Sequence, residues 1–122
     1  MNATGTTLYG IRNCDTMKKA RAWLDANAIA YRFHDYKVEG IDAPTLEGWC
    51  AQAGWERLLN RSGTTFRKIV PESERHGLDA AQAIALMLAH PSMIRRPVLR
   101  AGVHLAVGFD ESAWRALIAQ AG

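Results

Sequence analysis

The feature of the sequence that constrains the fold most is a strand pattern that runs directly into a helix pattern. Residues 6–11 are rich in β-forming side chains, and residues 15–27 place apolar side chains at helical spacing. The predicted inward stripe of this helix consists of Met17, Ala20, Leu24 and Ala28. Cys14 falls at the junction, where the first amide groups of a helix lack partners within it and the peptide dipoles create a positive potential. A sulfur at that position is stabilised as the thiolate, which is the nucleophilic form of cysteine.

The rest of the chain predicts a sheet built onto this unit. Residues 29–36 alternate in polarity as a second strand, which gives a right-handed βαβ unit with two parallel strands. Residues 96–100 and 103–107 are two further β-like runs, joined by a tight turn at Ala101–Gly102. A final helix begins at Asp110, and its buried positions are Trp114, Leu117, Ile118 and Ala121. This order predicts an α/β fold in which helices flank a four-stranded mixed sheet.

A helical insert over about residues 42–90 separates the second strand from the third. Asp42 can cap a helix that has Pro44 in its first turn, since proline suits the first helical position. A short helix over residues 55–61 follows, and it leads into a polar, basic segment at residues 62–68.

Residues 78–89 form the most apolar helix of the insert, and Asp79 is a candidate cap at its start. We predict that this helix is mostly buried along the stripe Ala81, Ile84, Ala85 and Leu88.

Length and composition limit the kind of protein. The chain has 122 residues, which predicts a single domain over residues 1–122, and its formal net charge is +3. No apolar run approaches the length of a membrane span, and residues 1–5 lack the pattern of a signal peptide, so we expect a cytoplasmic protein that does not bind membranes. A modest positive charge suits an anionic substrate or a nucleic acid, but no basic helix or aromatic platform favours direct binding to nucleic acid.

The two cysteines, Cys14 and Cys50, are too few for a disulfide scaffold. Met17 stands where a dithiol redox motif starting at Cys14 would have its second cysteine. A second thiol must therefore come from elsewhere, most simply from a small molecule such as glutathione. Cys50 lies at a helical spacing typical of a small buried hydrophobe, and the alternative is that it resolves a disulfide with Cys14.

Cationic side chains complete the candidate site. The Arg96–Pro97 step leads into the strand next to the first one, so a cis peptide bond there would bring Arg96 to face Cys14 with a planar fork suited to an oxyanion. Arg61 would need the insert folded over Cys14. For Arg96 and Arg61 the alternative is an ordinary solvated arginine.

Polar residues around Cys14 are further candidates for binding the substrate: Arg12, Asn13 and Lys18. Lys18 lies near the start of a helix, where the dipole disfavours cations. Either an anion offsets this repulsion, or the lysine is simply solvated.

Four segments resemble the arsenate reductase (ArsC)/Spx family, and its YffB branch in particular. They are residues 9–20, which include Cys14, the Asp35–Tyr36–Lys37 triplet, residues 58–68 and residues 90–99. The resemblance implies a thioredoxin/glutaredoxin-like fold with a helical insert between the second and third strands and a cis proline at Pro97.

The resemblance also implies roles for three residues. The cysteine at the position of Cys14 attacks the substrate, and the arginine before the proline, Arg96, helps to hold an oxyanion. An arginine from the insert maps to Arg61, with a shift of one residue onto Asn60 as the alternative. Arsenate reductases carry a further arginine in the segment that corresponds to residues 101–108, which contains none here.

We therefore expect a glutathione-dependent thiol reductase of the YffB type, with glutathione as co-substrate, glutaredoxin as a candidate partner, and a monomer without a tightly bound cofactor or metal. The alternatives are a glutaredoxin-coupled arsenate reductase and a non-catalytic, Spx-like regulator that binds RNA polymerase. Spx members usually have a second cysteine where Met17 stands, which disfavours a disulfide-switched regulator.

Overall fold

The computed structural model describes residues 5–121, which form two compact units. One unit contains the described residues up to Glu39 together with those from Arg96 onward, and the other is Gly40–Arg95. Each unit is described by itself below.

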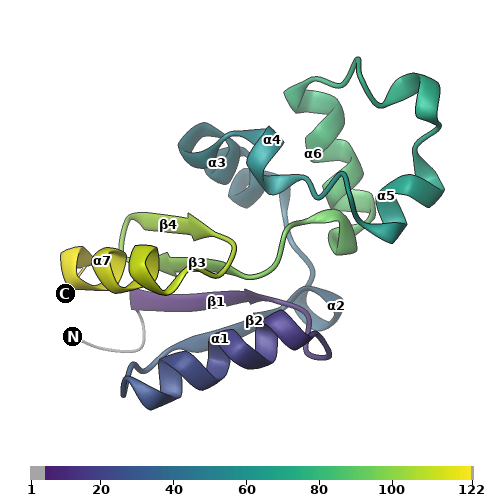
Figure 1. The fold of residues 1–122 in the computed structure, drawn as a ribbon. Helices are drawn as coiled ribbons and strands as arrows, with labels where there is room; N and C mark the ends of the chain where they lie inside the picture. The colour runs from purple at the N-terminus through teal and green to yellow at the C-terminus, as the bar shows by residue number, and fades with distance from the viewer. Residues whose placement is uncertain (1–4, 122) are drawn as a thin grey trace. The chain divides into compact units, whose positions relative to one another are not determined.

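The first unit is built on a mixed four-stranded sheet in the order β2-β1-β3-β4 (Figure 1). Its strands are β1 (Thr6–Gly10), β2 (Arg32–Asp35), β3 (Val98–Ala101) and β4 (His104–Val107). Strand β1 pairs with β2 in parallel and with β3 in antiparallel fashion, and β3 and β4 form an antiparallel hairpin. The predicted α/β class and mixed sheet are confirmed.

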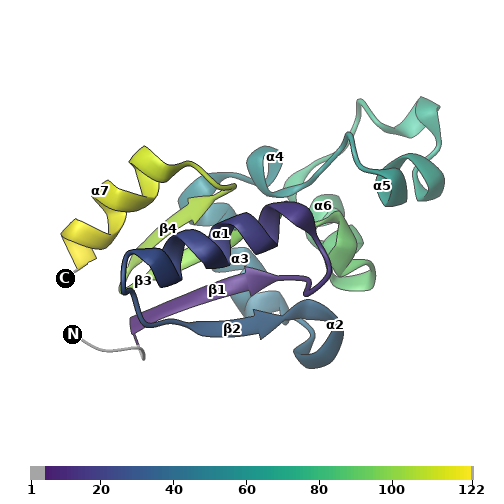
Figure 2. The same cartoon turned by 60° about the horizontal axis from the view of Figure 1, so that its bottom comes forward.

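Helices α1 (Asp15–Ala26) and α7 (Glu111–Ala121) pack on the same face of this sheet (Figures 1 and 2). Leu8 of β1 lies opposite Leu99 of β3, and both side chains are fully buried beneath the two helices. Trp114 of α7 is also fully buried, and its indole nitrogen donates a hydrogen bond to the carbonyl of Gly108 at 3.0 Å. This core fixes the start of α1 relative to the end of β1.

Gly10 is the last residue of β1, and the buried side chain of Met17 occupies the space that a side chain at this position would need. A β-carbon at Gly10 would overlap the Met17 sulfur and lie 2.6 Å from its methyl carbon. Met17 is fully buried, so the side chain three residues after Cys14 belongs to the core.

The second unit contains the helices of the insert: α3 (Ala43–Ala53), α4 (Trp55–Leu58), α5 (Thr64–Ile69), α6 (Ala80–Ala89), and the short 3-10 turns η2 (Glu72–Glu74) and η3 (Pro91–Met93). The predicted caps are present. The Asp42 carboxylate accepts a hydrogen bond from the Thr45 amide at 2.9 Å, and Asp79 and Gln82 form a reciprocal capping box.

Some local predictions were wrong. Ala28 is not part of the inward stripe of α1, because the helix ends at Ala26 and Ala28 has a left-handed backbone with φ of 56°. The second strand is shorter than residues 29–36, since Tyr36 begins the short helix α2 (Tyr36–Glu39). Helix α5 lies in the segment predicted to be a polar connection, and its Phe66 is buried.

The buried face of α6 also differs from the prediction. The helix buries Ala83 and Met87, whereas Ala81 and Ala85 of the predicted stripe are exposed. The reason is that α6 is apolar nearly all round, so its periodicity does not select a face. Within residues 5–121, no helix combines the length and the apolar character that a bilayer crossing requires.

Candidate active site

Cys14 is the N-cap residue of α1, as the sequence predicted. Its backbone is extended, with φ of −148° and ψ of 131°, and its carbonyl accepts the first helical hydrogen bond from Lys18 at 3.0 Å. The side chain is partly exposed and is not in a disulfide. The sulfur therefore lies at the positive end of α1 as a free thiol or thiolate.

The surroundings of Cys14 favour the thiolate. Partial burial acts to raise the pKa of the thiol, but hydrogen bonds to the sulfur from the Met17 amide, the Arg96 side chain and the Thr16 amide, together with the positive charge of Arg96, outweigh it. The net result is a pKa below the ordinary value for cysteine. At neutral pH, the fraction of Cys14 that is present as the nucleophilic thiolate is therefore larger than the fraction for a typical surface cysteine.

The register of the sheet explains how Arg96 reaches Cys14. Val98, the first residue of β3, lies opposite Tyr9 near the end of β1. Arg96 and Pro97 precede Val98, so they lie at the same edge of the sheet as the β1–α1 connection that carries Cys14. The Arg96–Pro97 peptide bond is cis, and the Pro97 carbonyl accepts a hydrogen bond from the Gly108 amide at 2.8 Å.

The other candidates near Cys14 lie on the surface of the first unit. Arg12 and Asn13 are exposed in the connection between β1 and α1, and Lys18 is exposed in the first turns of α1. Their positions leave them accessible to a ligand that approaches Cys14 from solvent.

Arg61 lies in the second unit, where it is exposed and its guanidinium carbon is 5.7 Å from the centre of the Trp55 ring. The neighbouring Asn60 has a local role instead. Its side-chain oxygen accepts a hydrogen bond from the Ser62 hydroxyl at 3.0 Å, and its backbone amide donates a hydrogen bond to the Met93 carbonyl at 2.8 Å. Of the two alternatives for the insert residue, Arg61 is the one whose side chain extends to solvent.

Cys50 differs from Cys14 in its electrostatic environment. It is only partly buried, so the prediction of a buried position was too strong. Burial raises the pKa of the Cys50 thiol, and the nearby carboxylates of Glu47 and Glu56 raise it further. These surroundings favour the neutral thiol, which is a poor nucleophile.

Sequence reasoning did not assign a role to Tyr36, although it lies within one of the quoted motifs. The Tyr36 ring stacks on the Tyr9 ring with centroids 6.4 Å apart, and its side chain is 2% exposed. Its position directly after β2, opposite the end of β1, places it at the sheet edge that carries Cys14 and Arg96. Only the strand pairing reveals this proximity.

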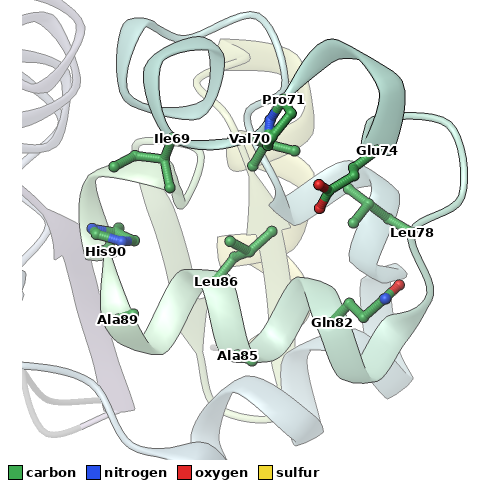
Figure 3. Close-up of a pocket in the computed structure, with 10 residues that line it drawn as sticks. All are labelled: Ile69, Val70, Pro71, Glu74, Leu78, Gln82, Ala85, Leu86, Ala89 and His90. Atoms are coloured by element: carbon green, nitrogen blue, oxygen red, sulfur yellow. The ribbon is translucent and has the colours of Figure 1, made fainter.

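A groove of about 340 Å³ lies in the second unit between α6 and the segment around Val70 and Pro71 (Figure 3). Figure 3 shows that mostly apolar side chains line it, with Glu74, Gln82 and His90 as the polar members. None of the predicted site residues lines this groove. Among residues 5–121, no group of three or more His, Cys, Asp or Glu side chains could hold a metal ion.

The sequence of this chain matches a known protein family over nearly its whole length. Residues 9–117 match the model of the ArsC family. The chain belongs to the ArsC family. The match includes Cys14 and Arg96, and it spans both units.

Two solved structures are similar to this ArsC-family chain over nearly its whole length. A protein named YFFB is 57% identical, with a TM-score of 0.87 over 93% of this chain and 98% of that chain. An arsenate reductase (ArsC) related protein from Brucella melitensis is 54% identical, with a TM-score of 0.78 over 95% of this chain and 96% of that chain. The predicted resemblance to the ArsC/Spx family and its YffB branch is confirmed.

Two curated relatives extend the comparison. An uncharacterized protein from Haemophilus influenzae is 37% identical over 93% of this chain and 98% of its own length. The global transcriptional regulator Spx 1 from Lactococcus lactis is 25% identical over 91% of this chain and 87% of its own length. The chain is therefore similar both to arsenate reductase-related proteins and to regulators.

Proposed function

We propose that this ArsC-family protein is a glutathione-dependent thiol reductase in which Cys14 is the nucleophile. The observation that carries the proposal is the placement of Cys14 at the N-terminal end of α1, beside Arg96, which lowers the pKa of its thiol. Membership of a family that includes arsenate reductase-related proteins supports a reductase in the broad sense.

The reaction that suits one nucleophilic cysteine is the reduction of a mixed disulfide between a substrate thiol and glutathione. The Cys14 thiolate attacks the glutathione sulfur, so that a bond forms between these two sulfurs and the original disulfide bond breaks. The substrate sulfur leaves with the electron pair as a thiolate. The substrate is thereby reduced, and Cys14 is left as a mixed disulfide with glutathione.

A second glutathione thiolate then attacks the glutathione sulfur of this adduct. Oxidised glutathione forms, and Cys14 leaves as the thiolate that began the cycle. The groups that lower the pKa of Cys14 assist this step because a thiol of lower pKa is a better leaving group. No second protein thiol is required, in keeping with a buried methionine at position 17.

The test is turnover of a mixed disulfide of glutathione and a small thiol peptide, with free glutathione as reductant. We expect Cys14→Ser to lose activity and Cys50→Ser, the matched control, to keep it. Turnover by Cys14→Ser at the rate of the unsubstituted protein would rule the proposal out.

A second candidate function is arsenate reduction, which is favoured by the similarity to the Brucella melitensis protein. In that reaction the Cys14 thiolate would attack the arsenic of arsenate, so that a sulfur–arsenic bond forms and one arsenic–oxygen bond breaks with its oxygen leaving as water, and glutathione would supply the two electrons that reduce the arsenic. Residues 101–108 contain no arginine, so the oxyanion would depend on Arg96 and on cations elsewhere in the chain. Arsenate-dependent oxidation of glutathione, measured with glutaredoxin supplied, distinguishes this function from the first.

A third candidate is a regulator that binds RNA polymerase, which is favoured by the similarity to Spx 1. Recovery of polymerase subunits with the tagged protein would support it. A pull-down that recovers none, from a protein that turns over the mixed disulfide, would leave the reductase as the better account.

A further inference from the structure

The buried side chain of Tyr36 has a placement that the proposed reductase mechanism does not use. Asp35, the last residue of β2, lies opposite Gly10, the last residue of β1, and Tyr36 follows it. Val98 begins β3 opposite Tyr9. Three segments therefore converge at one edge of the sheet, and they bring Tyr36, Cys14 and Arg96 into one neighbourhood within a single compact unit.

The hydroxyl of Tyr36 is the unusual part of this neighbourhood. The side chain is 2% exposed, and its oxygen is fully buried without a hydrogen bond to any of the described residues. Buried polar atoms are almost always hydrogen-bonded, because leaving one unpaired sacrifices its contacts with water. A phenylalanine at this position would provide the same packing against Tyr9 without that cost, so the hydroxyl itself requires an explanation.

Charged and titratable groups surround Tyr36, and they indicate a role for its buried hydroxyl. They are Tyr9 on β1, His34 on β2 and Arg96 before β3. Burial raises the pKa of Tyr36 well above its ordinary value, and the neighbouring Tyr9 raises it further, while the positive charge of Arg96 acts in the opposite direction. The hydroxyl is therefore neutral, and Arg96 is the cation that lies close enough to interact with its oxygen.

We propose that Tyr36 is a positioning residue that acts on Cys14 through Arg96. The hydroxyl makes no direct hydrogen bond to Arg96, but its dipole attracts that cation and so biases the guanidinium fork toward the Cys14 sulfur. Because the Tyr36 oxygen is itself inaccessible, it influences the thiolate through this attraction for Arg96 and does not contact the substrate.

This inference deepens the proposed function and rests on Cys14 as its nucleophile, but it can be tested without any substrate. The test is the pH dependence of Cys14 alkylation by iodoacetamide, measured in a Cys50→Ser background so that one thiol reacts. Tyr36→Phe removes the hydroxyl and keeps the ring. We expect the midpoint to move upward by about half a pH unit, which corresponds to about threefold less thiolate at a pH below the midpoint.

The control is Tyr31→Phe, which removes another tyrosine hydroxyl of the same unit. That hydroxyl accepts a hydrogen bond from Arg21 at 3.1 Å. We expect Tyr31→Phe to leave the midpoint of Cys14 unchanged. Denaturant unfolding of Tyr36→Phe establishes that the variant is folded, so that a shifted midpoint reports a local change at Cys14.

A double-mutant cycle with Arg96→Ala separates positioning from a general effect on the fold. If Tyr36 acts through Arg96, Tyr36→Phe has no further effect on the midpoint once Arg96 is alanine. An unchanged midpoint in the Tyr36→Phe protein, or an equal shift in the presence and absence of Arg96, overturns the inference. A failure of the proposed function appears differently: Cys14 would have an ordinary midpoint in the parent protein, or the parent would not turn over the mixed disulfide.

Discussion

The Arg96 side chain lowers the pKa of the Cys14 thiol, by hydrogen bonding and by its positive charge, although the two residues lie in distant parts of the chain. The antiparallel pairing of β1 with β3 creates this contact, because it places the segment before Val98 at the end of β1. Amide groups of the first turn of α1 act on the same sulfur. The site thus combines a local effect, the helix start, with a non-local one, the arginine.

Substitution of Arg96 tests the non-local contribution. Arg96→Ala removes both the hydrogen bond and the charge, and we expect the pKa of Cys14 to rise by about one unit, with Arg96→Lys giving a smaller rise because the charge remains. The measurement is the pH dependence of Cys14 alkylation. Arg95→Ala is the matched control, since the Arg95 side chain donates to the Arg57 carbonyl at 2.9 Å within the other unit. An equal shift in both variants would contradict a specific role for Arg96.

The two cysteines should affect stability in opposite directions as the pH rises. The folded state lowers the pKa of Cys14 below 9.0, so its ionisation stabilises the fold; that contribution is complete above the unfolded pKa and disappears as the pH falls through the folded pKa. The folded state raises the pKa of Cys50, so its contribution is lost as the pH increases into the alkaline range. Denaturant unfolding of Cys14→Ser and Cys50→Ser across neutral to alkaline pH checks both signs.

A methyl group at Gly10 should disturb the connection that carries Cys14. Gly10→Ala places a β-carbon against the sulfur and methyl group of buried Met17, and we expect a loss of about 1–3 kcal/mol in the free energy of unfolding. Gly48→Ala is the control. A β-carbon at Gly48 meets nothing within 4 Å, and alanine favours the helix α3, so this variant should gain up to about 1 kcal/mol. A Gly10→Ala protein as stable as its parent would show that Met17 repacks freely.

The capping box of α6 should contribute to the stability of the second unit. Asp79→Ala removes the acceptor for the Gln82 amide at 2.8 Å, and we expect a loss of about 1 kcal/mol. Asp79→Asn retains a capping side chain and should lose less. Thermal or denaturant unfolding gives the comparison, and equal losses in the two variants would argue against capping as the cause.

Local patterns predicted much of the fold. The change from strand to helix around Cys14 was visible in the spacing of Met17, Ala20 and Leu24, and the caps Asp42 and Asp79 were visible because capping depends on a few adjacent residues. The orientation of α6 was not visible, because a helix that is apolar nearly all round has no single stripe. Helix α5 was missed because its polar, threonine-rich sequence contains only one large side chain that is buried, Phe66.

The residues of the candidate site likewise fall into two groups: those that the local sequence could place and those whose roles depend on strand pairing and burial. The position of Cys14 at a helix start followed from neighbouring residues, and its contact with Arg96 required the assumption that the two strands are adjacent. Tyr36 could not be singled out, because its significance depends on burial and on strand pairing that no local pattern encodes. For Cys50 the helical spacing suggested burial, whereas the acidic neighbours Glu47 and Glu56 were the more informative signal.

The most direct test of the account is the identity of the cysteine that reacts with oxidised glutathione. The protein is incubated with oxidised glutathione near neutral pH, digested and analysed by mass spectrometry. We predict that Cys14 carries the glutathione adduct and that Cys50 remains a free thiol. An adduct on Cys50 alone, or equal modification of both cysteines, would contradict the claim that the start of α1 and Arg96 make Cys14 the nucleophile.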